Sequence, residues 1–301
     1  MADSSFKSDP PAVALLPPGT RVTWRLGQMP LDDLSWPVGR PDRLLRGTVS
    51  DMEPQDHLIA YVNSRLLYMP RPGLRAQVSV MVVEPQAIHG RHMAWLKVLW
   101  RRFFAILTCN PSLLDAVPNG RRFLFGSTWV PEWRATDMSK SRMLSLIAST
   151  KNFFEGHRLR HQTVDWLKAN RIDAEILGRG YVPFEHKSDG LAPYRYSVII
   201  ENVRETSYFT EKLIDCLLCD TVPIYWGAPD IEIFFDPRGM MICQSLEDIQ
   251  NAIRSVSEAD YRSRLEFIAK NKDKASHYAN HERAAALIVL SADAQRTKPK
   301  P

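Results

Sequence analysis

The sequence has few cysteines and no long apolar run. Only four of its 301 residues are cysteine, too few for a fold that depends on disulfides. The close pair Cys216 and Cys219 lies in an apolar run without a second pair of ligands, so we expect buried thiols and not a zinc site. No segment approaches the ~20 consecutive apolar residues of a membrane span, and residues 1–11 lack an apolar signal core. We therefore expect a protein of a reducing, cytoplasmic compartment.

Glycine-rich nucleotide loops are also missing. Glycine accounts for only 14 residues, and neither the G-x-G-x-x-G nor the G-x-x-x-x-G-K-[ST] pattern occurs. This argues against the common dinucleotide oxidoreductases and the P-loop NTPases. No Asp-x-Asp lies between apolar strands, so we expect no metal site.

The remaining composition is that of an ordinary globular chain. Apolar residues make up 45% and charged residues 24% of the sequence, which is long enough for two domains. The 39 basic and 34 acidic residues give a formal net charge of +5, a mild preference for anionic partners. Because the basic residues are scattered and form no continuous stripe, we do not expect a nucleic acid as partner.

Short runs of β-branched and aromatic residues alternate with amphipathic segments. The runs predict strands at 78–83, 103–107, 122–125, 143–147, 172–177, 196–200, 222–226 and 240–243, and helical periodicity falls at 93–102, 157–170, 210–219, 245–257 and 259–276. Interleaved in this way, they indicate an α/β fold with mostly parallel sheets. A loss of pattern over 130–142 suggests two domains, 13–138 and 139–291. The polar, proline-bearing ends, 1–12 and 292–301, are expected to be disordered.

Residues 91–104 allow two interpretations. The segment RHMAWLKVLWRRFF mixes bulky apolar side chains with arginine and lysine. A helix of this composition either packs one face on a core or lies on an anionic membrane surface. We keep peripheral membrane contact through 91–104 as the alternative to a core-facing helix.

Polar residues follow a buried strand in the second half of the chain. The strand ends at Ile200, and Glu201 and Asn202 come at its carboxyl end, where open α/β sheets bind ligands. Thr210 is a candidate N-cap of the next helix, whose free N–H groups favour an anion. Lys212 adds a full positive charge to that first turn.

A second strand closes the same region. It ends in Tyr225, Trp226 and Gly227, so we expect two strand ends to flank one pocket. The alternative is that residues 210–212 form only a capped, solvated helix start.

These motifs resemble those of the bacterial and animal alpha-1,3/4-fucosyltransferases. The family's Phe-Glu-Asn-Ser/Thr, Tyr-Val-Thr-Glu-Lys and Val-Pro-Ile-Tyr-Trp-Gly-Ser/Ala-Pro series stand here at 200–203, 208–212 and 222–229. The resemblance implies two facing Rossmann-like domains, the GT-B architecture, and transfer of fucose from GDP-fucose with inversion at the anomeric carbon. It implies no cofactor beyond this donor substrate. The acceptor it implies is a carbohydrate hydroxyl of a surface polysaccharide or glycolipid.

The resemblance also implies roles for single residues. Asn202, Tyr208, Glu211 and Lys212 match positions that hold the nucleotide, with Glu211 resembling the acceptor from the ribose hydroxyls and Lys212 a phosphate contact. From their places at the strand end and the helix start, we add Glu201 and Thr210 to the donor-binding set.

Two departures from the family pattern leave alternative functions open. Val203 replaces the usual Ser or Thr, and Ile200 replaces Phe. A different nucleotide sugar is therefore an alternative donor, and a non-catalytic module that binds a nucleotide or carbohydrate is a second alternative.

An arginine is expected upstream. Ser149 and Lys151 follow a predicted strand and are candidate pocket residues. The family places an arginine against the diphosphate seven residues before a helix leucine, and Arg160 fits this offset better than Arg158. An arginine fork can contact two phosphate oxygens at once.

One carboxylate in the first half is the candidate general base. Glu84 follows the strand 78–83, and the resemblance implies a base at this place, which would take the proton of the acceptor hydroxyl. His89 and His92 are the alternative bases or acceptor contacts. We expect His157 and His161 at the surface.

Overall fold

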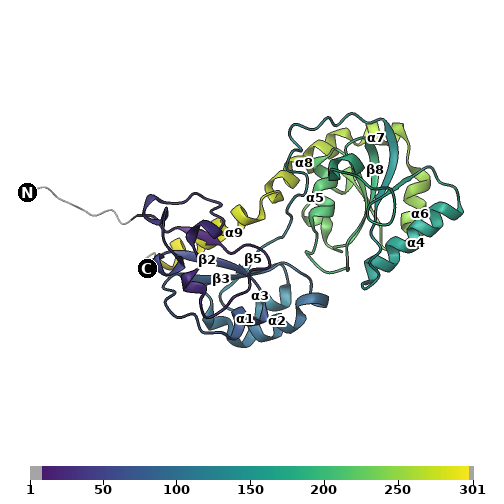
Figure 1. Cartoon of the computed structure of the whole chain (residues 1–301). Coiled ribbons are helices and arrows are strands. Elements are labelled where there is room, and N and C mark those ends of the chain that lie inside the picture. The colour runs from purple at the N-terminus through teal and green to yellow at the C-terminus, as the bar shows by residue number, and fades with distance from the viewer. Residues whose placement is uncertain (1–8, 298–301) are drawn as a thin grey trace, which may run out of the picture. The chain divides into compact units, whose positions relative to one another are not determined.

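The structure, a computed structural model, describes residues 9–297. It divides into two compact units (Figure 1). Unit 1 comprises the chain up to Phe123 together with the residues from Glu282 onward, and unit 2 comprises Leu124–His281. Residues 1–8 and 298–301 lie outside the described residues, and with them eight of the twelve residues of the first predicted disordered end and four of the ten of the second. Each unit is an α/β structure, which confirms the predicted fold class.

Unit 1 contains a parallel sheet whose strands follow the chain order. The strands are β1 (Val13–Leu15), β2 (His57–Tyr61), β3 (Gln77–Val82), β4 (Ile106–Thr108) and β5 (Gly120–Arg122). The β-branched run at 78–83 predicted β3 to within one residue at each end. β4 starts three residues later than expected. Phe103 and Phe104 are buried like strand residues, but they lie before the first residue of β4. β1, with three residues, and β2, with five, were not predicted, because the many prolines of the first seventy residues obscure any strand pattern there.

Helices cover this sheet, and one of them comes from the far end of the chain. They are α1 (Ser64–Tyr68), α2 (Gln86–Leu99), the 3-10 turn η5 (Trp100–Arg102), α3 (Pro111–Ala116) and α9 (His281–Thr297). The prediction of disorder was wrong for residues 292–297, which complete α9. Ala292 is buried and Arg296 donates to the Phe104 carbonyl, so this end packs on unit 1. Ala12 is likewise ordered, because its N–H donates to the buried Asp56 carboxylate at 2.9 Å.

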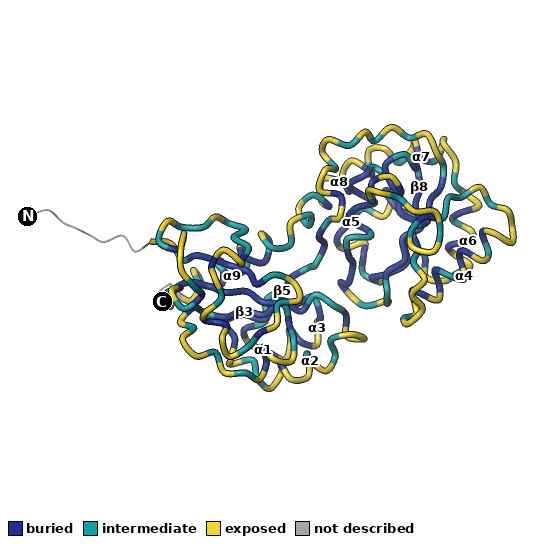
Figure 2. Tube along the Cα trace, viewed as in Figure 1, coloured by how far each residue is buried: buried dark blue, intermediate teal, exposed yellow. Residues whose placement is uncertain are grey.

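Unit 2 contains the second parallel sheet, in the order β10-β9-β8-β6-β7. Its strands are β6 (Arg142–Ile147), β7 (Glu175–Leu177), β8 (Tyr194–Ile200), β9 (Val222–Trp226) and β10 (Met241–Ile242). All pairings are parallel, as predicted. The dense β-branched and aromatic runs explain why these strands were readable, since β8 and β9 are buried along nearly their whole length (Figure 2).

Helices pack against both faces of the second sheet. They are α4 (Glu155–Ala169), α5 (Glu211–Leu218), α6 (Leu246–Ser255), α7 (Glu258–Ser263) and α8 (Leu265–Tyr278). Leu213 and Leu217 of α5 join Ala275 of α8 in one core cluster, whereas Val164 of α4 and Ile249 of α6 join another. The predicted helix 259–276 is divided into α7 and α8 at Arg264, whose guanidinium returns to Asp260.

The division into units differs from the predicted domains 13–138 and 139–291. Residues 124–138 belong to unit 2, because Thr128 and the backbone of Trp129 both donate to Asp215 of α5, at 2.6 and 3.0 Å. Lys140 extends this anchoring with hydrogen bonds to the carbonyls of Ala192 and Cys219. At its C-terminal end, unit 2 stops at His281, ten residues before the predicted domain limit at 291, and the rest of α9 belongs to unit 1.

Within residues 9–297, no helix combines the length and the apolar character that crossing a membrane requires.

Candidate functional site

The strand order of unit 2 reverses between β6 and β8. The chain passes from β6 outward to β7 and then returns to the other side of β6 with β8. In open α/β sheets the carboxyl ends of the strands at such a reversal form the crevice in which ligands bind. Helix α4 follows β6 and the loop 201–210 follows β8, so both lead away from this point.

Glu201 ties the loop after β8 to the start of α5. Its side chain is completely buried, and its two carboxylate oxygens accept from the Thr210 N–H at 2.8 Å and the Thr210 hydroxyl at 2.7 Å. The Thr210 hydroxyl in turn accepts from the Lys212 N–H, as an N-cap does. The first turn of α5 is thereby fixed beside the end of β8.

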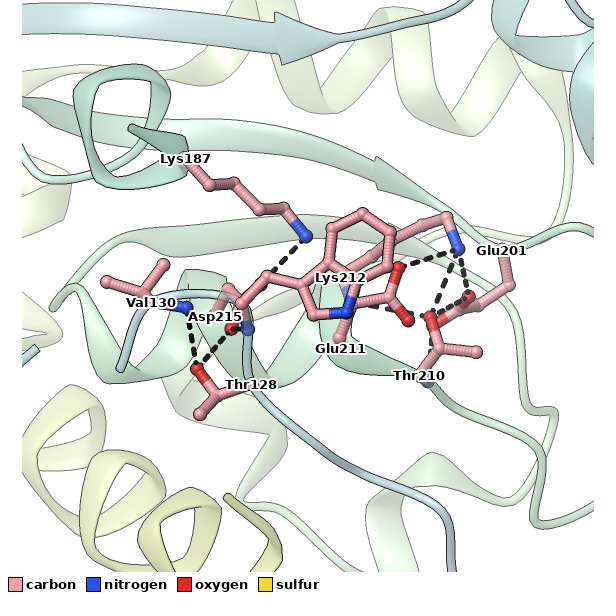
Figure 3. A network of polar contacts seen from close by, with 9 residues as sticks. Thr128, Val130, Lys187, Glu201, Thr210, Glu211, Lys212 and Asp215 are labelled. Carbon is pink, nitrogen blue, oxygen red and sulfur yellow. Dashed lines mark hydrogen bonds and ion pairs between the residues drawn. The ribbon is translucent and has the colours of Figure 1, made fainter. Parts of the chain in front are cut away.

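Lys212 projects from this turn between two carboxylates, as Figure 3 shows. Its ammonium nitrogen lies 3.5 Å from Glu201 Oε2, 3.5 Å from Glu211 Oε1 and 3.1 Å from the Thr210 hydroxyl. Burial alone would lower the pKa of Lys212, but Glu201 and Glu211 outweigh it and raise that pKa above its ordinary value. A quarter of the side chain remains exposed, so a permanent cation is available to a ligand.

Glu211 stays ionised at the same turn. Burial would raise its pKa, but the charges of Lys212 and Lys187 hold that pKa below the ordinary value. A carboxylate in this state, with 13% of its side chain exposed, accepts hydrogen bonds and donates none, which suits a ligand hydroxyl.

Arg160 reaches the same end of the sheet from α4. Its guanidinium donates to the Ile200 carbonyl at 2.6 Å, directly before Glu201. Burial lowers the pKa of Arg160, and the charges of Glu201 and Glu211 act in the opposite direction. The positive charge of Arg160 also acts on Lys212, whose pKa it lowers. The two cations that the sequence assigned to one anion therefore meet at one end of the unit 2 sheet.

His157 was expected at the surface, and this was wrong. The residue is buried, and its Nδ1 accepts from the N–H groups of Phe153 and Phe154 at 3.2 and 3.3 Å, closing the first turn of α4. Burial and the nearby charge of Arg160 lower the pKa of His157. His161 is half-buried, and its Nε2 lies 2.9 Å from the Lys151 carbonyl.

Gly156 brings α4 against the loop after β8. Its N–H donates to the Asn202 carbonyl at 3.0 Å, and a Cβ at this position would lie 1.7 Å from the Glu201 carbonyl oxygen. Only glycine allows this approach. Sequence reasoning missed the residue, since a single glycine near a helix start carries no distinguishing signal.

A second polar network lies one turn further along α5. Asp215 is completely buried and pairs with Lys187 at 2.7 Å, while Thr128 donates to its other oxygen (Figure 3). Burial raises the pKa of Asp215, although Lys187 and Thr128 act against the shift. Sequence reasoning missed this network too, because Thr128 and Lys187 are 87 and 28 residues away from Asp215.

The remaining candidates of unit 2 occupy different surroundings. Asn202 is half-buried, and Tyr208 is buried. Ser149 is half-buried and Lys151 is exposed, both in the loop between β6 and α4.

Two candidate pocket residues lie in the core. Tyr225 and Trp226 are 0% and 2% exposed, so their rings do not line an open pocket. The Tyr225 hydroxyl accepts from the Ala228 N–H at 2.9 Å. A Cβ on Gly227 would meet that hydroxyl at 2.3 Å and Glu201 Cγ at 2.7 Å, so these residues support Glu201 from within the protein. The sequence pattern identified the strand end correctly but not the direction of its side chains.

The candidate base and its alternatives lie in unit 1. Glu84 is half-buried in the turn between β3 and α2. His89 and His92 stand one turn apart on α2 with ring centroids 5.1 Å apart. Burial, with the neighbouring His92, lowers the pKa of His89 to about 4, and burial with Arg91 lowers the pKa of His92. Both rings are therefore neutral near pH 7.

Comparison with known proteins identifies relatives of unit 2. The model of the family described as glycosyltransferase family 10 (fucosyltransferase), C-terminal part, matches residues 138–293, about half of the chain. The alpha-(1,3)-fucosyltransferase FucT of Helicobacter pylori is 32% identical over 69 residues, which are 23% of this chain and 14% of that protein. An alpha-(1,4)-fucosyltransferase of Arabidopsis thaliana is 34% identical over 58 residues, 19% of this chain and 14% of that protein.

Solved structures extend the likeness to the fold of both units. A variant of S. aureus TarM, in complex with Fondaparinux, alpha-GlcNAc-glycerol and UDP, matches with a TM-score of 0.57 and 11% identity, over 80% of this chain and 56% of that one. With its two parallel five-stranded sheets, the chain has a GT-B-like fold.

Proposed function

Because the chain belongs to glycosyltransferase family 10, the fucosyltransferases, we propose that it transfers fucose from GDP-fucose to a hydroxyl of a carbohydrate acceptor. The observation that carries the proposal is the meeting of Lys212, Arg160 and the N-terminus of α5 at the reversal point of the unit 2 sheet. Two cations and a helix start suit a diphosphate.

The donor would be held by side chains of unit 2. Lys212 and Arg160 bind the diphosphate, and the ionised Glu211 accepts from the ribose hydroxyls. Asn202 and Tyr208 belong to the same subsite. Glu201 acts on the ligand indirectly, since Thr210 and Lys212 already occupy its carboxylate oxygens.

The reaction is a single displacement with inversion. The acceptor oxygen forms a bond to the anomeric carbon while the bond from that carbon to the phosphate oxygen breaks. Glu84 takes the proton of the acceptor hydroxyl, and the electron pair leaves with GDP. Lys212 and Arg160 stabilise the negative charge that develops on the leaving diphosphate, so no second acid is needed.

The acceptor and location belong to the same proposal. We assign a surface polysaccharide or glycolipid as acceptor and the cytoplasm as location. All four cysteines are free thiols, which fits a reducing compartment.

A second candidate is a transferase that uses another nucleotide sugar. Ile200 is a core residue, so its departure from the family pattern changes packing. Val203, in contrast, is half-buried in the loop beside Asn202, where it can alter contacts to a donor.

A donor screen tests both candidates. We expect GDP and GDP-fucose to raise the melting temperature more than UDP, CMP and dTDP sugars do, and GDP-fucose to be consumed in the presence of a carbohydrate acceptor panel. A larger shift with a UDP sugar would favour the second candidate. Tight GDP binding without turnover over the whole panel would favour a non-catalytic binding module.

A further inference from the structure

One stretch of unit 1 is almost free of acidic residues. From His57 to Leu114 the only acidic residue is Glu84, whereas the same stretch has seven arginines and lysines. The seven basic residues are Arg65, Arg71, Arg75, Arg91, Lys97, Arg101 and Arg102. The excess of positive charge therefore lies in α1, the loop 69–76, α2 and η5, whereas basic and acidic residues are nearly equal in number over the whole chain.

Four arginines line one cavity of unit 1, three of them from this stretch. The cavity has a volume of about 390 Å³ and is lined by Arg71, Arg101, Arg102 and Arg296 together with Phe103 and Phe104. No acidic side chain is among its lining residues. Within residues 9–297, none of the four arginines takes part in an ion pair.

The arginines are held by carbonyl groups and rings instead. Arg71 donates to the Arg102 carbonyl at 3.3 Å, and Arg102 donates to the Met69 carbonyl at 2.8 Å. Burial, followed by the charge of Arg102, lowers the pKa of Arg71 to about 10. Like charges are thus kept together without a protein anion, an arrangement that an added phosphate would stabilise.

An apolar surface adjoins the cavity. Helix α2 packs Met93 and Leu96 into the core, so the core-facing prediction is correct for one side of the helix only. On its other side Trp95 is 40% and Val98 68% exposed. Trp95 meets the exposed Tyr68 edge to face at 5.4 Å. In Figure 2 the exposed parts of α1 and α2 are yellow and lie on the outer side of unit 1.

The cavity and the apolar surface are linked at the end of α1. Tyr68 is followed by Met69, whose carbonyl accepts from Arg102 of the cavity. Ile88, Trp95 and Val98 lie three to seven residues apart and share one side of α2, with Arg91 among them. We call these residues, with Tyr68 and the four cavity arginines, the α2 face.

We propose that the α2 face docks unit 1 on a bilayer that contains anionic phospholipid, with a lipid phosphate in the arginine cavity and Trp95 and Val98 in the headgroup layer. Interfacial binding needs apolar side chains beside arginine or lysine, and each basic residue close to an anionic surface adds to the affinity. Single-stranded RNA fits this face less well. Val98 and Ile88 offer no ring for stacking, and Trp95 and Tyr68 are packed on each other.

The test is co-sedimentation of the whole chain with vesicles. We expect binding to phosphatidylcholine vesicles that contain 30% phosphatidylglycerol, little binding to pure phosphatidylcholine, and release at 0.5 M NaCl. The double variant Arg101→Gln/Arg102→Gln should bind at least about tenfold more weakly, since it removes two positive charges from the surface. Val98→Asp should weaken binding by a similar factor.

Matched controls separate the α2 face from general charge and exposure. Arg254→Gln/Arg262→Gln removes two exposed charges from α6 and α7, and Ile233→Asp changes a side chain that is 71% exposed. Both should sediment like the unchanged protein, and all variants should keep its melting temperature within a few degrees.

Several results would overturn the proposal. These are equal binding to both vesicle types, equal losses in the control variants, and no binding to either vesicle. Release by inorganic phosphate at constant ionic strength would assign the cavity to a free anion. Binding of a single-stranded RNA in place of vesicles would assign the face to nucleic acid. None of these results depends on the donor, so the proposed transfer reaction is tested separately.

Discussion

The ammonium nitrogen of Lys212 lies 3.5 Å from the completely buried carboxylate of Glu201. The same nitrogen is 3.5 Å from Glu211, so one cation lies between two anions at the start of α5. Arg160 brings the formal sum of these four charges to zero. The free N–H groups at the start of the helix then add the partial positive charge that favours a diphosphate.

Replacement of Lys212 by alanine should weaken donor binding and also destabilise unit 2. A charge-assisted hydrogen bond contributes about 1.5–3 kcal/mol, so we expect GDP to bind at least about tenfold more weakly. Glu201 would lose its cationic partner, which lowers the melting temperature. The control is Lys272→Ala, because Lys272 is 24% exposed, pairs with Asp220 at 2.6 Å, and belongs to α8. Isothermal titration with GDP should separate the two variants, and equal affinities would remove Lys212 from the site.

Two arginines of α4 provide a matched pair. Arg160 is buried and donates to the Ile200 carbonyl, whereas Arg158, two residues earlier, is exposed. We expect Arg160→Gln to weaken GDP binding about tenfold or more and Arg158→Gln to change it less than twofold. Thermal shift with GDP at several concentrations measures both. The assignment would be reversed if the Arg158 variant lost the shift and the Arg160 variant kept it.

Gly156 should not tolerate a side chain. A Cβ would lie 1.7 Å from the Glu201 carbonyl oxygen, so Gly156→Ala must separate α4 from the loop after β8. We expect a loss of about 2 kcal/mol or more in stability and loss of GDP binding. Gly90→Ala in α2 is the control, because its nearest neighbour is a flexible Gln86 side chain at 3.5 Å. That change should be neutral or stabilise by about 0.5–1 kcal/mol. Denaturant unfolding of both variants is the measurement.

The sheet of unit 2 was predictable because its signals are local. β8 and β9 are continuous β-branched and aromatic runs, and the helix start at Thr210 is fixed by its own side chain. The meeting of Arg160 with Lys212 followed from topology, since residues after neighbouring parallel strands lie at one edge of the sheet.

What the sequence did not reveal depends on contacts between distant residues. His157 reads as a polar helix residue, yet its burial follows from the approach of α4 to the loop at Asn202. Tyr225 alternates correctly along β9, but the side to which its ring points depends on the covering helices. The order of α9 depends on Arg296 and Phe104, which are 192 residues apart.

Glu84 should be needed for transfer and not for donor binding. Glu84→Gln keeps the shape of the side chain but cannot take a proton, so we expect transfer to fall about 10²–10⁴-fold with unchanged GDP affinity. His89→Gln and His92→Gln are the comparisons, and each should retain most of the rate. A Glu84→Gln protein of normal activity, or a comparable loss in a histidine variant, would assign the base elsewhere.

Protonation of His157 should make unit 2 less stable in mild acid. Its folded pKa is lowered by burial and by Arg160, so the folded state favours the neutral ring. This contribution is complete above the unfolded pKa of about 6.5 and is lost as the pH falls from there through the lowered folded value. Each pKa unit corresponds to about 1.4 kcal/mol. The Nδ1 atom that would be protonated accepts two backbone N–H groups, which gives the loss its structural cause.

The variant His157→Gln tests this by removing the titration while keeping an acceptor. A glutamine at the third helical position can accept from the residue before the helix, so stability at pH 7.5 should change little. Between pH 7.5 and 5.5 the melting temperature of the unchanged protein should fall by a few degrees more than that of the variant. His277→Gln, an exposed position on α8, should follow the unchanged protein. If His157→Gln shows the full acid loss, the destabilisation arises from another group, and the cap at α4 does not titrate in this range.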